Sequence, residues 1–323
     1  MNFWNIGERL NQTDAAHLSH IKNGGRLRDA FKIAGLHSQF ARDFLQHTDA
    51  AQDEVIVRRT RGQEGRVYPT FNVIGTVSSR IMVSDPHLQH LRRRYRGILA
   101  ADPGKRLIYV DYSQFEPGIL AYLADDASMI AAYNEGDLYT ALCQRVFGTT
   151  DHRPLSKQMF LAFCYGMTPE RISGLVAKAG DADGALNCNQ AVNDFFLSFP
   201  GLGEYRSRLA GELERDGYVS SLWGNRRNRT RRGPLTHKEK RWAVNQPIQA
   251  TAALIFKEAI IRLAETFGNC SILLPMHDAV LLQFDDDETF GDRLVQAEAL
   301  MLDAFHRRCP GISAKVIAGP FAE

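Results

Sequence analysis

The chain has 323 residues and a formal net charge of only +2, with 44% hydrophobic residues. This length allows about two domains with a sizeable core, and the balanced charge excludes a uniformly basic nucleic-acid-binding protein. The five cysteines show no zinc-like or CxxC spacing, which fits a reducing compartment. No stretch is long and apolar enough to span a membrane, and the N-terminus lacks the layout of a signal peptide.

Positive charge is concentrated locally although the total is small. Two runs stand out, and they comprise Arg92, Arg93, Arg94 and Arg96, followed by Arg226, Arg227, Arg229, Arg231 and Arg232. Clustered arginines can follow a phosphate backbone, although any one of them can equally be a solvated surface residue.

The first 66 residues give the weakest signals. Residues 15–22 and 26–46 are predicted helices separated by Gly24 and Gly25, and residues 48–64 form a polar linker. Residues 68–80 are then predicted as a strand and a turn.

A short apolar run at residues 107–110 predicts a buried strand that ends on Asp111. The chain then turns toward a helix that contains Glu116. An acid at a strand end can hold a divalent cation through its oxygens, although most such aspartates only cap helices or turns.

A helix is predicted from Arg153 onward, because Pro154 suits its first turn and Gly166 its end. Arg153, Lys157, Leu161 and Tyr165 recur every four residues and therefore form one slowly drifting stripe. Such a stripe would meet a triphosphate with its cations and a base with its tyrosine. The plainer alternative is a surface helix with solvated cations.

Residues 238–267 form a long helical pattern that Pro247 is expected to interrupt. Arg241, Asn245 and Gln249 share one face of it. Farther on, residues 271–276 and 279–284 predict two apolar strands around His277 and Asp278. The plainer interpretation is an ordinary turn. If Asp278 and Asp111 meet, the pair can bridge two Mg²⁺ ions, with Mn²⁺ as an alternative.

Three stretches, in this order, resemble motifs A, B and C of the family A (DNA polymerase I-like) DNA polymerases. They read Asp-Tyr-Ser-Gln-x-Glu from Asp111, Arg-x3-Lys-x7-Tyr-Gly from Arg153, and His-Asp at residues 277–278. The resemblance extends from about Gly75 to the C-terminus. It implies an α+β right-hand fold with an antiparallel palm sheet, helical fingers and a reduced thumb. The implied divisions are thumb 1–66, palm 67–124, fingers 125–235 and a second palm segment 236–323.

The resemblance also implies a role for each matched residue. Asp111 and Asp278 would hold two Mg²⁺ ions, and Lys157 and Arg153 would complete the catalytic set. The incoming deoxynucleoside triphosphate would contact Arg153, Lys157, Leu161, Tyr165, Glu116, Gln114 and Tyr139. Primer–template DNA would contact Arg80, Arg94, Arg226, Arg227, Arg241, Asn245, Gln249 and His277. The implied activity is template-directed DNA synthesis by two-metal-ion phosphoryl transfer, without a proofreading exonuclease in this chain.

Three residues depart from the family pattern: Thr76 in place of an arginine, Leu161 in place of an aromatic residue, and Ala279 in place of a glutamate. They leave open a decayed polymerase that only binds nucleic acid. A single-subunit RNA polymerase is the other alternative, and Glu116, which blocks a ribose 2′-hydroxyl, argues against it. We expect a cytoplasmic, nucleoid-associated protein, or one of the host cytoplasm if it is viral. The expected partner is a separate thumb or exonuclease chain or a processivity factor.

Overall fold

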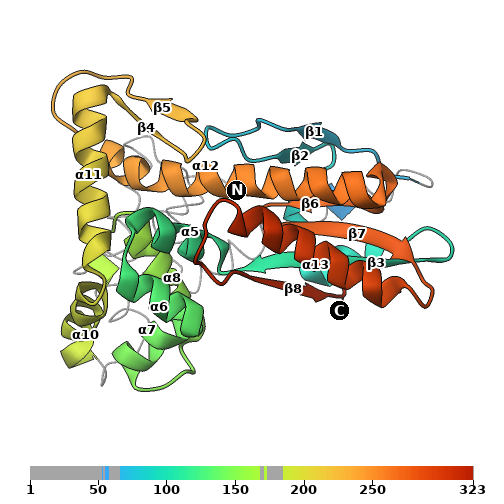
Figure 1. The fold of residues 1–323 in the computed structure, drawn as a ribbon, viewed down its shortest axis with the longest axis horizontal. Coiled ribbons are helices and arrows are strands. Elements are labelled where there is room, and N and C mark those ends of the chain that lie inside the picture. Colours follow the sequence, from blue (N-terminus) through green and yellow to red (C-terminus); the bar gives the residue numbers. More distant parts are fainter. Residues whose placement is uncertain (1–52, 54, 58–65, 168–170, 173–184, 323) are drawn as a thin grey trace, which may run out of the picture.

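The structure is a computed structural model that describes residues 53, 55–57, 66–167, 171–172 and 185–322. Figure 1 shows a sheet region on the right, a helical region on the left, and the long helix α12 running along both. Most of the expected thumb, residues 1–66, lies outside the described residues. None of the described helices is long and apolar enough to cross a membrane.

The central sheet is antiparallel, as expected for the palm. Its strands are β3 (Lys105–Ser113), β6 (Ile272–Met276), β7 (Ala279–Asp285) and β8 (Lys315–Gly319), in the order β6-β7-β3-β8. The first six residues of β7 are all buried, which explains why five of them are apolar without alternation. The register sets Asp111 opposite Ala279 on β7 and Ile317 on β8. Asp111 therefore lies beside the β6–β7 turn that carries Asp278.

Both faces of this sheet are covered. Helices α12 (His237–Phe267) and α13 (Phe290–His306) contribute to the main core together with Val110, Val280 and Leu282. A second core, with Leu274 and Leu281, includes residues of β2 (Met82–Ser84) and of the 3₁₀ helix η1 (Leu88–His90). The 3₁₀ helices η2 (Arg93–Ile98) and η3 (Asn269–Ser271) complete the connections.

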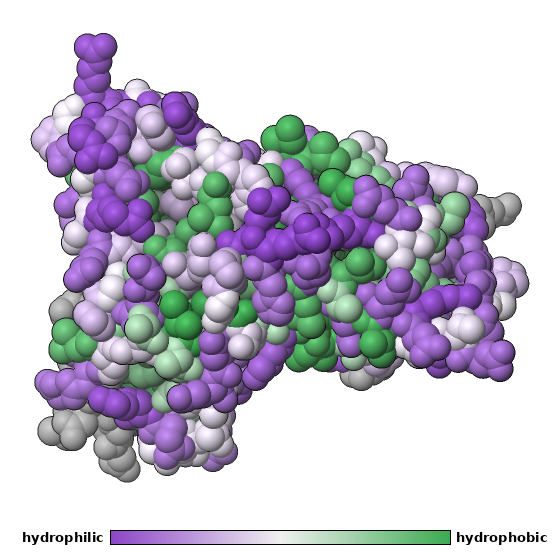
Figure 2. Space-filling view, in the orientation of Figure 1, coloured by the Kyte–Doolittle hydropathy of each residue, from purple (hydrophilic) through white to green (hydrophobic). Residues whose placement is uncertain are grey.

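Strand β2 pairs with β1 (Thr70–Asn72), which confirms the strand and turn predicted at residues 68–80. Exposed apolar side chains lie on and around this hairpin, namely Tyr68, Phe71, Val73, Ile74 and Val77. Figure 2 shows hydrophobic surface at the top of the molecule, where Figure 1 places β1 and β2.

The helical region comprises α5 (Phe115–Ala124), α6 (Ala127–Glu135), α7 (Leu138–Phe147), α8 (Arg153–Cys164), α10 (Ala185–Leu197) and α11 (Pro200–Asp216). Its core is aromatic, and the rings of Phe163 and Phe196 stack 3.5 Å apart. Pro200 begins α11 after α10 has ended, because proline suits a first helical turn. The short hairpin β4 (Tyr218–Ser220) and β5 (Arg226–Asn228) follows.

Helix α12 runs unbroken for 31 residues, so the predicted interruption at Pro247 is wrong. Proline removes one backbone donor, and the helix offsets this cost by burying Pro247 and its neighbours Gln246 and Ile248. A capping box fixes the N-terminus, because Glu239 N–H donates to Thr236 Oγ1 and Thr236 N–H donates to Glu239 Oε2.

Glu239 also joins α12 to the residues after β5. Its Oε1 lies 2.9 Å from Nε of Arg229, and both side chains are about nine-tenths buried. The backbone N–H of Thr236, followed by Arg229, lowers the pKa of Glu239 to about 2. The ionised glutamate therefore stabilises the fold above its ordinary pKa of 4.5, and that contribution is lost as the pH falls toward 2.

We expect Glu239→Gln to lower the melting temperature at pH 7, and the difference from wild type to narrow below pH 4.5. The reason is that glutamine cannot pair with the Arg229 cation, whereas acid removes the same charge from the wild type. Glu212→Gln is the matched control, since Glu212 pairs with Arg208 on the surface of α11. Equal shifts for Glu239→Gln and Glu212→Gln would contradict this assignment.

Candidate active site

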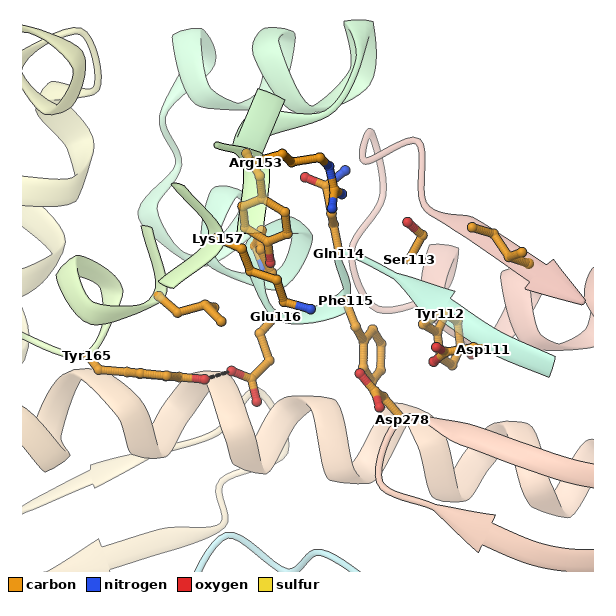
Figure 3. Close-up of a pocket in the computed structure, with 14 residues that line it drawn as sticks. Asp111, Tyr112, Ser113, Gln114, Phe115, Glu116, Arg153, Lys157, Tyr165 and Asp278 are labelled. Atoms are coloured by element: carbon orange, nitrogen blue, oxygen red, sulfur yellow. Dashed lines mark hydrogen bonds between the residues drawn. The ribbon is translucent and has the colours of Figure 1, made fainter. Parts of the chain in front are cut away.

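One pocket of about 340 Å³ brings the three sequence motifs together. It lies between the end of β3, the middle of β8, the β6–β7 turn, and helices α5, α7 and α8, and Figure 3 shows its lining side chains. The lining residues are Asp111, Tyr112, Ser113, Gln114, Phe115, Glu116, Pro117, Tyr139, Arg153, Lys157, Leu161, Tyr165, Asp278 and Ile317. All nine residues assigned to catalysis or nucleotide binding from the sequence are among them.

The two carboxylates approach each other from neighbouring strand ends. Asp111 ends its pairing opposite Ala279, and Tyr112 N–H donates to the carbonyl oxygen of Asp278 over 3.4 Å. Oδ1 of Asp111 is buried without a hydrogen-bond partner. Burial, and next the charge of Asp278, raise the pKa of Asp111 to about 7. Burial also raises the pKa of Asp278.

This pair fits a divalent cation on two observations. A buried carboxylate oxygen without a donor lacks the partner that a cation would supply, and the burial that raises the pKa of Asp111 makes its ionised form unfavourable without such a partner. No cluster of three or more Asp, Glu, His or Cys side chains suited to a metal occurs in the described part of the chain. Two carboxylates are enough for Mg²⁺ when substrate phosphates and water provide the remaining ligands.

Ala279 follows Asp278, pairs with Asp111 across the strands, and is completely buried. A glutamate here would add a third carboxylate beside Asp111, whose pKa the charge of Asp278 already raises.

Helix α8 directs its cations toward α7. The guanidinium carbon of Arg153 lies 5.4 Å from the centre of the Tyr139 ring, and Nζ of Lys157 lies 5.8 Å from it. Tyr139 itself is buried, and burial raises the pKa of its hydroxyl. Both cations are thereby held on one wall of the pocket, opposite the carboxylates in Figure 3.

Glu116 is held from two sides at the entrance to α5. The Tyr165 hydroxyl donates to Oε2 of Glu116, and the Arg80 guanidinium pairs with Oε1. Gln249 lies beside the Tyr165 hydroxyl. Arg80 thus reaches the site, whereas the Thr76 hydroxyl bonds to the backbone N–H of Arg80 and to Ser78. Helix α12 supports this turn, since Lys257 donates to Ser79 over 2.8 Å.

Gln114 adopts a left-handed backbone with φ of 49° just before α5. Its Oε1 accepts from the backbone N–H of Leu138 over 3.0 Å, at the start of α7. The side chain predicted to touch the nucleotide therefore also ties the end of β3 to α7.

The predicted DNA-binding residues lie at several places around this pocket. Arg241 packs against Gly166 at the end of α8, and Oδ1 of Asn245 is buried without a hydrogen-bond partner. The His277 ring lies 6.3 Å from that of His90, and burial, followed by the charge of Arg80, lowers its pKa. These residues border the site.

Three arginines of the predicted set are engaged elsewhere. Arg94 pairs with Asp53 over 3.3 Å, Arg226 stacks on Tyr218, and Arg227 stacks on Trp242. None of them lines the pocket. Their roles toward DNA remain predictions, and Arg229 of the same run is internal.

Sequence reasoning did not single out Asp137 and Ile317. Ile317 comes from β8, whose pairing beside β3 no local pattern reveals. Asp137 could have been recognised as a helix N-cap, because it directly precedes an amphipathic segment. Its contact with Arg153 depends on tertiary packing and was not predictable.

Comparisons with known proteins identify the family that this sequence matches. The model of "DNA polymerase family A" matches residues 9–304. DNA polymerase I of Chloroflexus aurantiacus is 29% identical over 314 residues, which cover 87% of this chain and 32% of that protein. Thermostable DNA polymerase I of Thermus thermophilus is 31% identical over 245 residues, covering 69% of this chain and 28% of that protein. The chain thus spans about a third of the curated relatives it matches.

A solved structure shares the fold. The polymerase domain of Pol1 from M. smegmatis, described as a complex with DNA primer–template and dNTP, superposes with a TM-score of 0.73 at 26% identity. The match covers 90% of this chain and 55% of that one. Together with the matched family model, the shared fold shows that the chain belongs to DNA polymerase family A.

Proposed function

We propose that the chain is a template-directed DNA polymerase that adds deoxynucleotides to a primer 3′ end. The observation that supports this most is the single pocket in which Asp111 and Asp278 face Arg153 and Lys157. Carboxylates opposite cations suit phosphoryl transfer, which depends on positioning and on charge stabilisation. The primer–template and dNTP of the M. smegmatis complex are the substrates proposed here.

In this proposal Asp111 and Asp278 hold two Mg²⁺ ions. When bound, the ions would lower the pKa of the primer 3′-hydroxyl and neutralise charge on the triphosphate. Lys157 and Arg153 approach the phosphates from the opposite wall, where they stabilise the charge that develops on the leaving pyrophosphate. Lys157 is also placed to donate a proton to that leaving group.

The remaining pocket residues would select the nucleotide. Glu116, fixed by Tyr165 and Arg80, occupies the space that a 2′-hydroxyl needs. Tyr165 and Leu161 would lie beside the nascent base pair. Tyr139 would support both cations, and Gln114 would fix the start of α7.

For DNA we propose the face of α12 that carries Arg241, Asn245 and Gln249. Minor-groove acceptors occur on every correct base pair, so amide side chains there can test geometry without reading sequence. Arg80 and His277 border the primer end in this arrangement. The sheet segments 67–124 and 236–323 then form the palm, and 125–235 form the fingers.

Primer extension on DNA and RNA templates, with deoxynucleotides or ribonucleotides and Mg²⁺, tests the function. We expect extension with deoxynucleotides on DNA, no extension without a divalent cation, and no shortening of a mismatched primer by this chain. Efficient extension with ribonucleotides would favour an RNA polymerase instead. Tight DNA binding without any extension would indicate a chain that only binds nucleic acid.

We expect Leu161→Tyr to increase incorporation of dideoxynucleotides relative to deoxynucleotides. Leu161 lines the pocket on the same helix as Lys157, and a ring there would contact the incoming sugar and base. The measurement is the ratio of kcat/KM values for the two nucleotides. Leu155→Met on the same helix is the control, because Leu155 packs against the core instead. An unchanged ratio in Leu161→Tyr would show that this position does not sense the sugar.

A further inference from the structure

The carboxylate of Asp137 bonds to two different elements at once. Its Oδ1 accepts from the backbone N–H groups of Tyr139 and Thr140, over 2.8 and 2.9 Å, and so caps α7. Its Oδ2 accepts from Arg153 on α8, with Nε 3.1 Å away and Nη2 also in contact. Oδ1 therefore caps helix α7, and Oδ2 binds the Arg153 guanidinium.

The contact leaves Arg153 able to bind a second anion. Asp137 takes the N–H of Nε and one N–H of Nη2, and a guanidinium has five such donors. Arg153 lines the pocket, whereas Asp137 is not among its lining residues. The N–H groups that Asp137 leaves free can thus bind a phosphate while the contact with Asp137 persists.

The start of α7 is unavailable as a phosphate site of its own. The N–H of Leu138 donates to Gln114, and the next two N–H groups donate to Asp137. A phosphate at this wall of the pocket must therefore be met by side chains, which makes the direction of Arg153 decisive.

We propose that Asp137 is a positioning residue that holds the Arg153 guanidinium toward the phosphates of the incoming nucleotide. The proposal rests on the function proposed above and adds a residue that touches neither nucleotide nor DNA. The Asp137 carboxylate restricts the rotamers of the long Arg153 side chain before the nucleotide binds. This lowers the conformational-entropy cost of binding the nucleotide.

A double-mutant cycle in the full chain separates this role from helix capping. Asp137→Asn keeps Oδ1 as a cap but replaces the oxygen that holds Arg153 by an amide that cannot accept. Arg153→Met removes the guanidinium and leaves no donor for Asp137 to hold. The readouts are kcat and KM for single-nucleotide incorporation, and dNTP affinity measured on a primer ended with a dideoxynucleotide, so that no chemistry occurs.

We expect Asp137→Asn to raise KM and weaken dNTP affinity about tenfold, with a smaller change in kcat. In the Arg153→Met background the same substitution should change KM less than about twofold, because the cation that Asp137 holds is already absent. Asp126→Asn is the matched control: Asp126 caps α6 through Met129 N–H and accepts from Gly201 N–H. It should lower the melting temperature and leave KM unchanged.

Two results would overturn the proposal. An equal rise in KM in both backgrounds would show that Asp137 acts through α7 alone. A fall in KM in Asp137→Asn would show that the carboxylate competes with the nucleotide for Arg153. A wild-type chain that incorporates no nucleotide would instead contradict the proposed function, so the two failures are distinguishable.

Discussion

Replacement of Asp111 or Asp278 by alanine is expected to lower the rate of primer extension by about a thousandfold or more, since loss of a metal-centred contact costs several kcal/mol in the transition state. The two carboxylates meet at neighbouring strand ends, and burial raises both pKa values. Such a pair stabilises the fold poorly when it is ionised. We therefore expect folding and DNA binding to survive its removal.

Single-turnover extension by each variant, with melting curves and DNA-binding assays alongside, measures the effect. Asp111→Asn and Asp278→Asn keep the shape and remove the charge, so they should be as inactive as the alanine variants. Asp285→Ala is the matched control, because Asp285 ends β7 away from the pocket and pairs with Lys105. Extension by Asp111→Ala at near the wild-type rate would refute the assignment of the site.

The second large effect is expected for Glu116→Ala, which should reduce discrimination against ribonucleotides by about a hundredfold. The Glu116 carboxylate is fixed by Tyr165 and Arg80, so it cannot swing away from a 2′-hydroxyl. Alanine leaves that space empty. The same change frees Tyr165 and Arg80, and for that reason we also expect slower incorporation of deoxynucleotides.

Tyr165→Phe distinguishes the loss of discrimination against ribonucleotides from the slower incorporation of deoxynucleotides. It removes the hydroxyl that bonds to Glu116 but leaves the carboxylate in place, so it should loosen discrimination much less than Glu116→Ala. The measurement is the ratio of kcat/KM for each deoxynucleotide over its ribonucleotide. A ratio that is the same in Glu116→Ala and wild type would assign the sugar selection to another residue.

The parts of the site that lie within one element were predictable from sequence. The spacing of Arg153, Lys157, Leu161 and Tyr165 placed these residues on one helix stripe, and all four line the pocket. The convergence of Asp111 and Asp278 was harder to foresee, because it depends on the pairing of β3 with β7, which are far apart in sequence. The motif resemblance supplied what periodicity alone could not.

The sequence-based predictions that differ from the structure do so for a common physical reason. The energetic cost of a proline inside a helix predicted a break at Pro247. Burial of side chains along both halves of α12 outweighed the loss of one backbone hydrogen bond. Within the basic run at 226–232, Arg229 is buried against Glu239, whereas the roles of Arg226 and Arg227 toward DNA stay predictions. In each case tertiary packing decided an outcome that local propensity left open.

The most direct test of the central claim is incorporation of each deoxynucleotide, one at a time, opposite each of the four template bases. The wild-type chain with Mg²⁺ should add only the complementary nucleotide efficiently. The Asp111→Asn, Asp278→Asn double variant should add none at a comparable rate while binding the same DNA. Addition that ignores the template base, or equal addition by the double variant, would contradict a template-directed polymerase built on this pocket.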